Sequence, residues 1–300
     1  MTRNDCFTWM CISLLPMSAH PSTPANPASP GPASTARIRL HHLQSAKVQG
    51  AKFAMLTAYD TMMASIFDSA GIEVLLVGDS AANTVMGYSS TLPITLDDMV
   101  VFAKSVVSGA KRALVVCDLP FGSYEVSPEQ AVASAVKLMK EGGVQAVKLE
   151  GGAYFVPHVR ALVAAGVPVM AHIGFTPQSE HALGGYRVQG RGDAADAMVA
   201  DAQALEAAGA FAVLMEMVPT ETAARVDASL HVPTVGIGAG GATTGQVLVW
   251  QDMLGLGAGK GARFVKKYAD LRSVVAGAAA AYHDEVLGGV FPGPEHEFGQ

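Results

Sequence analysis

Cysteine, charge and basic clusters are all scarce in this sequence. Only three of its 300 residues are cysteines, at positions 6, 11 and 117. So few thiols cannot form a disulfide framework, which indicates a reducing cytoplasm. Charged residues make up 15% of the chain, its net charge is -6, and no basic run is interleaved with aromatic residues. This composition argues against nucleic acid as a partner, while the 50% of apolar residues are enough for a large core.

A long apolar run is missing too. The apolar segment 7–17 is too short to span a membrane, so no membrane partner is expected. It lies in residues 1–36, which hold six of the 16 prolines and are predicted to be a disordered tail before a single domain over 37–300. Two alternatives stay open: a start codon placed too far upstream, or a signal-peptide core behind Arg3. Against the signal peptide, Asp5 flanks the core and no convincing cleavage site follows it.

From residue 37 onward, short apolar runs alternate with helical patterns. Asp193 and Ser127 are predicted to cap the two clearest helices, over 193–209 and 127–143. Runs that are apolar throughout are typical of strands buried on both faces. The eight candidate strands are 53–58, 74–79, 113–118, 145–150, 167–172, 211–217, 233–238 and, less clearly, 246–250. Eight strand–helix units in about 260 residues predict an α/β fold, a (β/α)8 TIM barrel, with a doubly wound sheet as the main alternative.

A glycine motif supports that alternative at first sight. Gly236, Gly238 and Gly241 in 236-GIGAGG-241 have the G-x-G-x-x-G spacing of a dinucleotide-binding loop. Such a loop normally follows the first strand of its domain, whereas this one follows the seventh apolar run. We therefore interpret it as a turn that lines the site. A dinucleotide-binding oxidoreductase remains the alternative, and a titration with NADH would distinguish it.

Polar side chains stand at the ends of five successive apolar runs. They are Asp79, Asp118, Lys148, Glu150, His172 and Glu216. Any one of them could be a helix cap or a core histidine, but in a barrel all strand ends meet at one mouth. Two carboxylates about 4 Å apart repel by roughly 4 kcal/mol at an effective dielectric near 20, so the set needs a cation, a basic group or shared protons.

Carboxylate oxygens favour Mg²⁺ as that cation, and a single histidine makes zinc less favoured. With Lys148, the metal would suit a small anionic substrate such as a 2-oxo acid, and Glu216 or His172 could act as the base. The long loops 80–95 and 174–192 leave strand ends and could cover the mouth as lids.

Several strings in the same order closely resemble one family. They are 56-LTAYD-60, 77-VGDS-80, 118-DLPF-121, 147-VKLEGG-152, 172-HIGFTPQS-179, 188-VQGRG-192 and 235-VGIGAGGATTGQ-246. In these strings the chain resembles the ketopantoate hydroxymethyltransferases, from about Ala51 to 291–298 and without the proline-rich N-terminus. The resemblance implies a Mg²⁺-dependent (β/α)8 enzyme of pantothenate biosynthesis. Such an enzyme transfers a hydroxymethyl group from 5,10-methylenetetrahydrofolate to 3-methyl-2-oxobutanoate, giving 2-dehydropantoate.

The resemblance also implies roles for individual residues. Asp79, Asp118 and Glu150 would bind the metal, directly or through water. Ser80 and Lys148 would hold the oxo acid, with Asp79 and Asp118 also at the substrate. Glu216 would accept the proton and His172 would lie close to the substrate. A cytoplasmic, ring-shaped homodecamer is implied as well.

Two further alternatives are another kind of Mg²⁺ barrel and an inactive barrel. A Mg²⁺ barrel of the phosphoenolpyruvate mutase and isocitrate lyase type would be expected to carry a lid motif such as K-K-C-G-H, which this sequence does not contain. A catalytically inactive barrel acting as a scaffold would gain nothing from clustered buried charge. The acids and Lys148 together therefore argue against a scaffold.

Overall fold

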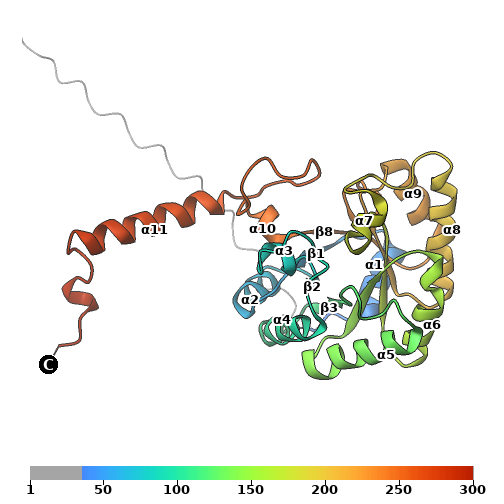
Figure 1. The fold of residues 1–300 in the computed structure, drawn as a ribbon, viewed down its shortest axis with the longest axis horizontal. Helices are drawn as coiled ribbons and strands as arrows, with labels where there is room; N and C mark the ends of the chain where they lie inside the picture. The colour runs from blue at the N-terminus through green and yellow to red at the C-terminus, as the bar shows by residue number, and fades with distance from the viewer. Residues whose placement is uncertain (1–35, 300) are drawn as a thin grey trace, which may run out of the picture. The chain divides into compact units, whose positions relative to one another are not determined.

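A computed structural model describes residues 36–299 as a closed barrel of eight parallel strands with helices around it (Figure 1). The strands are β1 Phe53–Thr57, β2 Val74–Val77, β3 Leu114–Asp118, β4 Ala146–Glu150, β5 Val169–Gly174, β6 Ala212–Glu216, β7 Thr234–Ile237 and β8 Gly245–Leu248. Each strand pairs with its sequence neighbours, and β1 closes the ring against β8. The predicted (β/α)8 fold is confirmed and the doubly wound alternative is wrong. Residues 1–35, which hold almost all of the predicted tail, lie outside the described part.

Helix α1 precedes β1, and helices follow every strand except β7. They are α1 Leu40–Gln49, α2 Thr61–Ser69, α3 Ala81–Thr84, α4 Leu96–Gly109, α5 Pro128–Lys137, α6 Val156–Ala164, α7 Glu180–Leu183, α8 Ala194–Ala207, α9 Thr220–Ser229, α10 Trp250–Met253 and α11 Leu271–Leu287. A π-helical turn, Leu138–Gly142, extends α5, and short 3-10 turns lie at Ala153–Phe155, Pro177–Ser179 and Pro294–His296. Within residues 36–299, no helix combines the length and hydrophobicity that crossing a bilayer requires.

The two predicted helix caps have different outcomes. Ser127 is extended, and its side chain accepts a hydrogen bond from the backbone N–H of Gln130 at 3.3 Å. Asp193 does precede α8, but its side chain makes no capping hydrogen bond. Its backbone is already helical, with φ -62° and ψ -25°, whereas a capping residue needs an extended conformation to turn its side chain back onto the first N–H groups.

Alternation along the strands divides the core into two shells. Side chains that point outward, such as Leu75, Val115 and Val147, pack under the helices. Those one residue away, such as Val74 and Leu114, fill the barrel interior, because successive side chains of a strand point to opposite faces. The interior cluster also includes Leu43 of α1. Helix α1 therefore packs against the interior at the end where the strands begin.

Helix α11 differs from the others because none of its residues is buried. Its exposed apolar side chains are Val274, Val275, Tyr282, Val286 and Leu287. A cavity of about 280 Å³ lies between β1 and β8. Its lining includes Met55, Leu248, Met253 and Tyr268. The eighth strand is followed by the short α10, and no residue of the longer α11 lines this cavity.

Candidate active site

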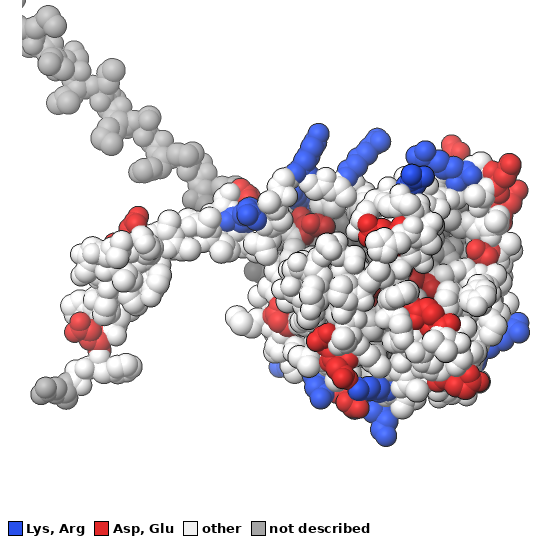
Figure 2. All heavy atoms as spheres, in the orientation of Figure 1, with Lys and Arg blue, Asp and Glu red and all other residues white. Residues whose placement is uncertain are grey.

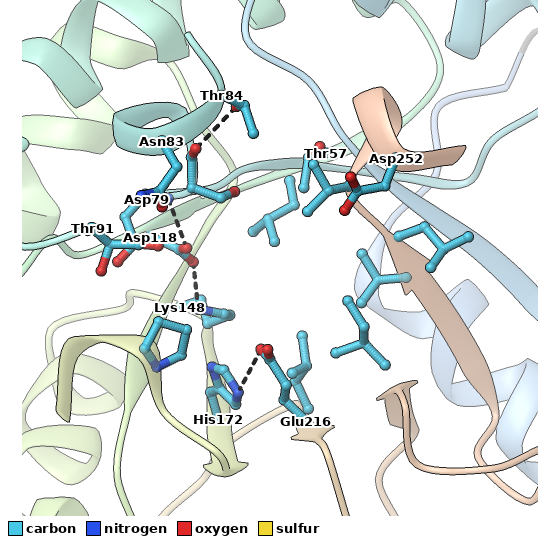
Figure 3. A pocket seen from close by; sticks show the side chains of 18 of the residues that line it. Thr57, Asp79, Asn83, Thr84, Thr91, Asp118, Lys148, His172, Glu216 and Asp252 are labelled. Atoms are coloured by element: carbon cyan, nitrogen blue, oxygen red, sulfur yellow. Dashed lines mark hydrogen bonds and ion pairs between the residues drawn. The ribbon is translucent and has the colours of Figure 1, made fainter. Parts of the chain in front are cut away.

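The predicted site residues meet in one cavity of about 400 Å³ at the carboxyl ends of the strands. Its lining includes Asp79, Ser80, Asp118, Lys148, Glu150, His172 and Glu216, together with Asp252 of α10 (Figure 3). Strand alternation explains the convergence. Ala146 of β4 and Leu214 of β6 belong to the interior cluster, so Lys148 and Glu216, two residues further on, face the same interior at the open end. Pairing of Glu150 with His172 across β4 and β5 places those two side by side.

Lys148 is the central cation of this cavity. Its side-chain Nζ lies 2.8 Å from Oδ1 of Asp118 and 3.8 Å from Oε1 of Glu150, and all three side chains are at most 4% exposed. Burial alone would lower the pKa of Lys148, but Asp118, Glu150 and Asp79 together raise it above its usual value. The lysine therefore stays charged and holds the adjoining carboxylates in place.

The cavity contains more acid than Lys148 can neutralise. Burial, together with the charges of Asp118 and Glu150, raises the pKa of Asp79 well above its usual value. Burial also raises the pKa of Glu150 to about 7, although Lys148 opposes the shift. The pKa of Glu216 is raised to about 8, first by burial and then by the charge of Glu150. Near neutral pH the site must bind protons or a further cation.

His172 stands between two of these acids. Its Nδ1 lies 3.4 Å from Oε1 of Glu150, and its Nε2 lies 3.6 Å from Oε2 of Glu216. Burial and then the charge of Lys148 lower the pKa of His172 well below its usual value, so the imidazole is neutral. Among the described residues neither ring nitrogen has a hydrogen-bond partner. A neutral imidazole has one N–H to donate, so it can hydrogen bond as a donor to only one of the two carboxylates at a time.

Gln178 makes four hydrogen bonds, and two of them join it to acids of this cavity. Its side-chain N–H₂ donates to Oδ2 of Asp79 and to the carbonyl of Leu119, each at 2.9 Å. Its backbone N–H donates to Oε2 of Glu150 at 3.0 Å, and its Oε1 accepts from the Tyr124 hydroxyl at 2.6 Å. Gln178 therefore fixes the orientation of two carboxylates that come from different strands.

Sequence reasoning missed Gln178 because it considered strand ends. Gln178 lies in the 3-10 turn Pro177–Ser179, inside the string 172-HIGFTPQS-179 that carries the family resemblance. That string was the one available signal. Tyr59, just past β1, is also buried, and its hydroxyl lies 2.8 Å from Oγ of Ser80. Asp60 does have an ordinary role, since its side chain caps α2 by accepting from the N–H of Met63.

The donor set fits a hard divalent cation. All the acids offer oxygen. Burial raises the pKa values of Asp79 and Glu150, and the charges of neighbouring acids add to the shift. Mg²⁺ commonly takes one or two carboxylates and completes its octahedron with water and substrate oxygens. Asp79 and Asp118 could supply that pair, because the backbone N–H of Asp79 donates to Oδ2 of Asp118 at 3.0 Å and so brings the two residues together. Within residues 36–299 no three His, Cys, Asp or Glu side chains are grouped as a metal site. The arrangement is compatible with a metal site in which two carboxylates bind directly and Glu150 acts through water.

The glycine motif lies beside this cavity. Gly238 has φ +62°, and a Cβ there would lie 2.8 Å from the Phe264 ring. Gly240 has φ +76°, and a Cβ there would meet Thr220 at 2.6 Å. Both glycines line a second cavity, next to the one that holds the acids. The segment is therefore a close-packed turn after β7. Its glycine spacing matches that of a dinucleotide-binding loop, but it lies in a closed barrel and not in a dinucleotide-binding domain.

Fold and site together define a class: a (β/α)8-barrel enzyme whose cavity combines a buried lysine, several carboxylates and a neutral histidine. Comparison with known proteins gives the family. The profile of the ketopantoate hydroxymethyltransferase family matches residues 37–294. The chain belongs to that family, and it is an enzyme of the transferase class.

Two relatives illustrate the similarity. The 3-methyl-2-oxobutanoate hydroxymethyltransferase of Paenarthrobacter aurescens (strain TC1) is 62% identical, over 96% of this chain and 100% of the relative. The protein of the same name from Arthrobacter sp. (strain FB24) is 64% identical, over 92% of each chain. Among solved structures, 2,3-dimethylmalate lyase, a member of the PEP mutase/isocitrate lyase superfamily, has a TM-score of 0.55. It shares 19% identity, over 87% of this chain and 91% of its own, so it supports the fold alone.

The charge cluster makes a prediction about stability. Lys148→Met leaves Asp118 and Glu150 buried without their cation, and breaking such a buried pair costs about 3–5 kcal/mol. The double variant Lys148→Met/Asp118→Asn should lose less stability than the sum of the two single variants, because the two groups compensate each other. Urea unfolding at one protein concentration, with EDTA present, measures both effects. Additive losses would contradict the coupling.

Proposed function

We propose that the protein transfers a hydroxymethyl group from 5,10-methylenetetrahydrofolate to 3-methyl-2-oxobutanoate, forming 2-dehydropantoate in pantothenate biosynthesis. The single observation that carries this proposal is the arrangement of Lys148 and Glu216 in one cavity, within a chain of this family. Lys148 is a buried, charged group that can hold a small carboxylate. Glu216 is a carboxylate with a raised pKa, and a raised pKa makes a carboxylate a stronger base once it is deprotonated.

In the proposed reaction each residue acts at a stated atom. Lys148 neutralises the carboxylate of the oxo acid, and Ser80 donates a hydrogen bond to it. Glu216 removes the proton from C3, and the electron pair of that C–H bond forms the enolate. Water adds to the methylene carbon of the donor, the bonds of that carbon to N5 and N10 break, and the two nitrogens take up the protons of water as tetrahydrofolate leaves. The C3 carbon of the enolate bonds to the released formaldehyde carbon, and the formaldehyde oxygen takes the proton held by Glu216 and becomes the hydroxyl group. His172, 3.6 Å from Glu216, orients the Glu216 carboxylate.

Asp79 and Asp118, with Glu150 through water, are the residues that would hold Mg²⁺ beside the keto oxygen. When bound, the metal would polarise the ketone and lower the energy of the enolate. The excess of buried acid supports this assignment, because a divalent cation would offset charge that Lys148 leaves uncompensated. Gln178 contributes by hydrogen bonding one oxygen of Asp79 and one oxygen of Glu150, which orients both carboxylates.

An assay of 2-dehydropantoate formation tests the proposed function. The purified protein should form product from 3-methyl-2-oxobutanoate only when both 5,10-methylenetetrahydrofolate and Mg²⁺ are present. EDTA should abolish the activity, and added Mg²⁺ should restore it. Absence of product in the complete mixture would overturn the proposed function. Undiminished product in EDTA would overturn the proposed requirement for Mg²⁺.

Exchange of the C3 proton into D₂O, followed by NMR, tests the role of Glu216 separately. Glu216→Gln should slow exchange by about 10²- to 10⁴-fold, the range typical of a general base. In the wild type, kcat/KM for exchange should rise with pH and level off above about 8, because only the deprotonated carboxylate accepts a proton. Asp252→Asn, an acid on the same cavity wall, is the matched control and should exchange normally. Wild-type rates in Glu216→Gln would exclude this base.

We also propose that the protein is a cytoplasmic homodecamer, as the family resemblance implies. Two observations support self-association: α11 has no buried residue, and an apolar cavity lies between β1 and β8. Val274→Lys/Leu287→Lys should therefore lower the mass measured by analytical ultracentrifugation, whereas Glu285→Gln on the same helix should not. An unchanged mass in the lysine variant would show that this face is not the contact. The buried, unpaired Cys117 accords with a reducing compartment.

A further inference from the structure

A second cavity, of about 670 Å³, adjoins the acid-lined one. The two share four lining residues, Tyr186, Glu216, Ala262 and Phe264. Glu216 therefore lines both cavities. A molecule in the second cavity could present an atom to whatever is bound beside Glu216.

The second cavity has a different chemical character. Its charged lining residues other than Glu216 are two arginines, Arg191 and Arg263. Both side chains are exposed, and neither takes part in the ion pairs found among residues 36–299. Figure 2 shows basic side chains along the edge of this face where Figure 1 places the segment after α10 and helices α7 and α9. Two guanidinium groups at one rim, without acidic partners, form a binding site for an anion.

The rest of the wall of the second cavity is largely apolar and aromatic. It is formed by side chains that include Tyr186, Val188, Val218 and Phe264. The ring of Tyr186 packs on Phe175 at a centroid distance of 4.6 Å. A flat ring system could lie against this wall, since offset stacking on aromatic side chains is favourable. The volume is within the range, about 300–1,000 Å³, of sites for molecules of cofactor size.

The segment that carries Arg191 is anchored to the site. The backbone N–H of Gln189 donates to the carbonyl of Met217 at 3.0 Å. The hydroxyl of Thr222 donates to the carbonyl of Gly190 at 2.8 Å. Met217 follows Glu216 directly and has φ +48°, a left-handed conformation that side chains other than glycine rarely adopt. The same strained turn thus positions the base and the segment before Arg191.

We propose that the second cavity binds the folate donor and that Arg191 and Arg263 bind the carboxylates of its glutamyl tail, so that they favour donors with a longer, polyanionic tail. This inference rests on the proposed function. The donor has a flat pterin ring at one end and glutamate carboxylates at the other. The aromatic wall next to Glu216 suits the ring, because the methylene carbon must reach the carbon that Glu216 deprotonates. The arginines at the rim suit the tail.

Steady-state kinetics with 5,10-methylenetetrahydrofolate in its monoglutamate and triglutamate forms test the inference. Wild-type KM should be lower for the triglutamate. Arg191→Ala/Arg263→Ala should raise the triglutamate KM roughly tenfold, as expected for two exposed charge contacts, and should remove the preference. The kcat should change less than about twofold. Arg263→Lys, which keeps the charge, should recover part of the loss.

Arg187→Ala is the matched control, because Arg187 belongs to the same loop but lines neither cavity. It should retain the wild-type preference. The exchange of the C3 proton, measured without folate, should be unchanged in the double variant, which separates donor binding from damage to the base. An equal KM for both tail lengths in the wild type, or an unchanged preference in the double variant, would overturn the inference.

A binding measurement keeps the inference testable even if the proposed function fails. Calorimetric titration with the triglutamate of 5-formyltetrahydrofolate, a stable analogue of the donor, needs no turnover. Wild-type protein should bind it more tightly than the monoglutamate, and Arg191→Ala/Arg263→Ala should bind both equally. Binding that the arginines do not affect would overturn the inference, whereas binding as expected without product formation would overturn the proposed reaction alone.

Discussion

The site depends on one interaction, the buried contact between the Lys148 ammonium and the Asp118 carboxylate, 2.8 Å apart. Taking two charges out of water costs several kcal/mol per ion, so the pair persists only because each group compensates the other. The pairing of Asp118 with Lys148 across β3 and β4 sets this contact through the backbone. Lys148 neutralises only part of the acid around it, however. The remaining negative charge, added to the effect of burial, raises the pKa of Glu216 to about 8. Lys148 and Glu216 are thus two parts of one electrostatic arrangement.

The barrel provides that arrangement through strand alternation alone. Positions that hold Val116 on β3 and Ala146 on β4 fill the interior with apolar side chains. Two residues further along the same strands, the same inward direction places Asp118 and Lys148 at the open end. Apolar packing below the charged layer keeps water out from beneath it, and this low-dielectric surrounding strengthens the charge interactions that shift the pKa values. The core and the site are therefore successive layers of one structure.

The same alternation explains how much the sequence could predict. The apolar runs located the strands to within one or two residues. Because the parallel strands of a barrel bring their ends together, the grouping of the acids with Lys148 and His172 could be predicted. Gln178 did not follow, because it reaches the acids from a loop turn, and a loop has no repeating direction. The Asp193 cap failed for a similar reason, since composition suggests a cap but the local φ and ψ decide whether the side chain can turn back. The exposure of α11 could not be predicted either. Its apolar pattern would be the same whether the helix packed on its own barrel or on another copy of the chain.

Two cavities of unlike charge share Glu216 in their linings, and such a pair suits the proposed reaction between two unlike anions. The acid-lined cavity can accept a small oxo acid, because Lys148 and a divalent cation would offset the carboxylate. A donor with several carboxylates would add negative charge where Asp79 and Glu150 already have raised pKa values, and each further close carboxylate would cost about 4 kcal/mol at an effective dielectric near 20. The tail of such a donor must therefore bind away from the acids. In the proposed complex Arg191 and Arg263 would provide that separation, and the apolar side chains of the same cavity would let an uncharged ring approach Glu216 without bringing the tail along.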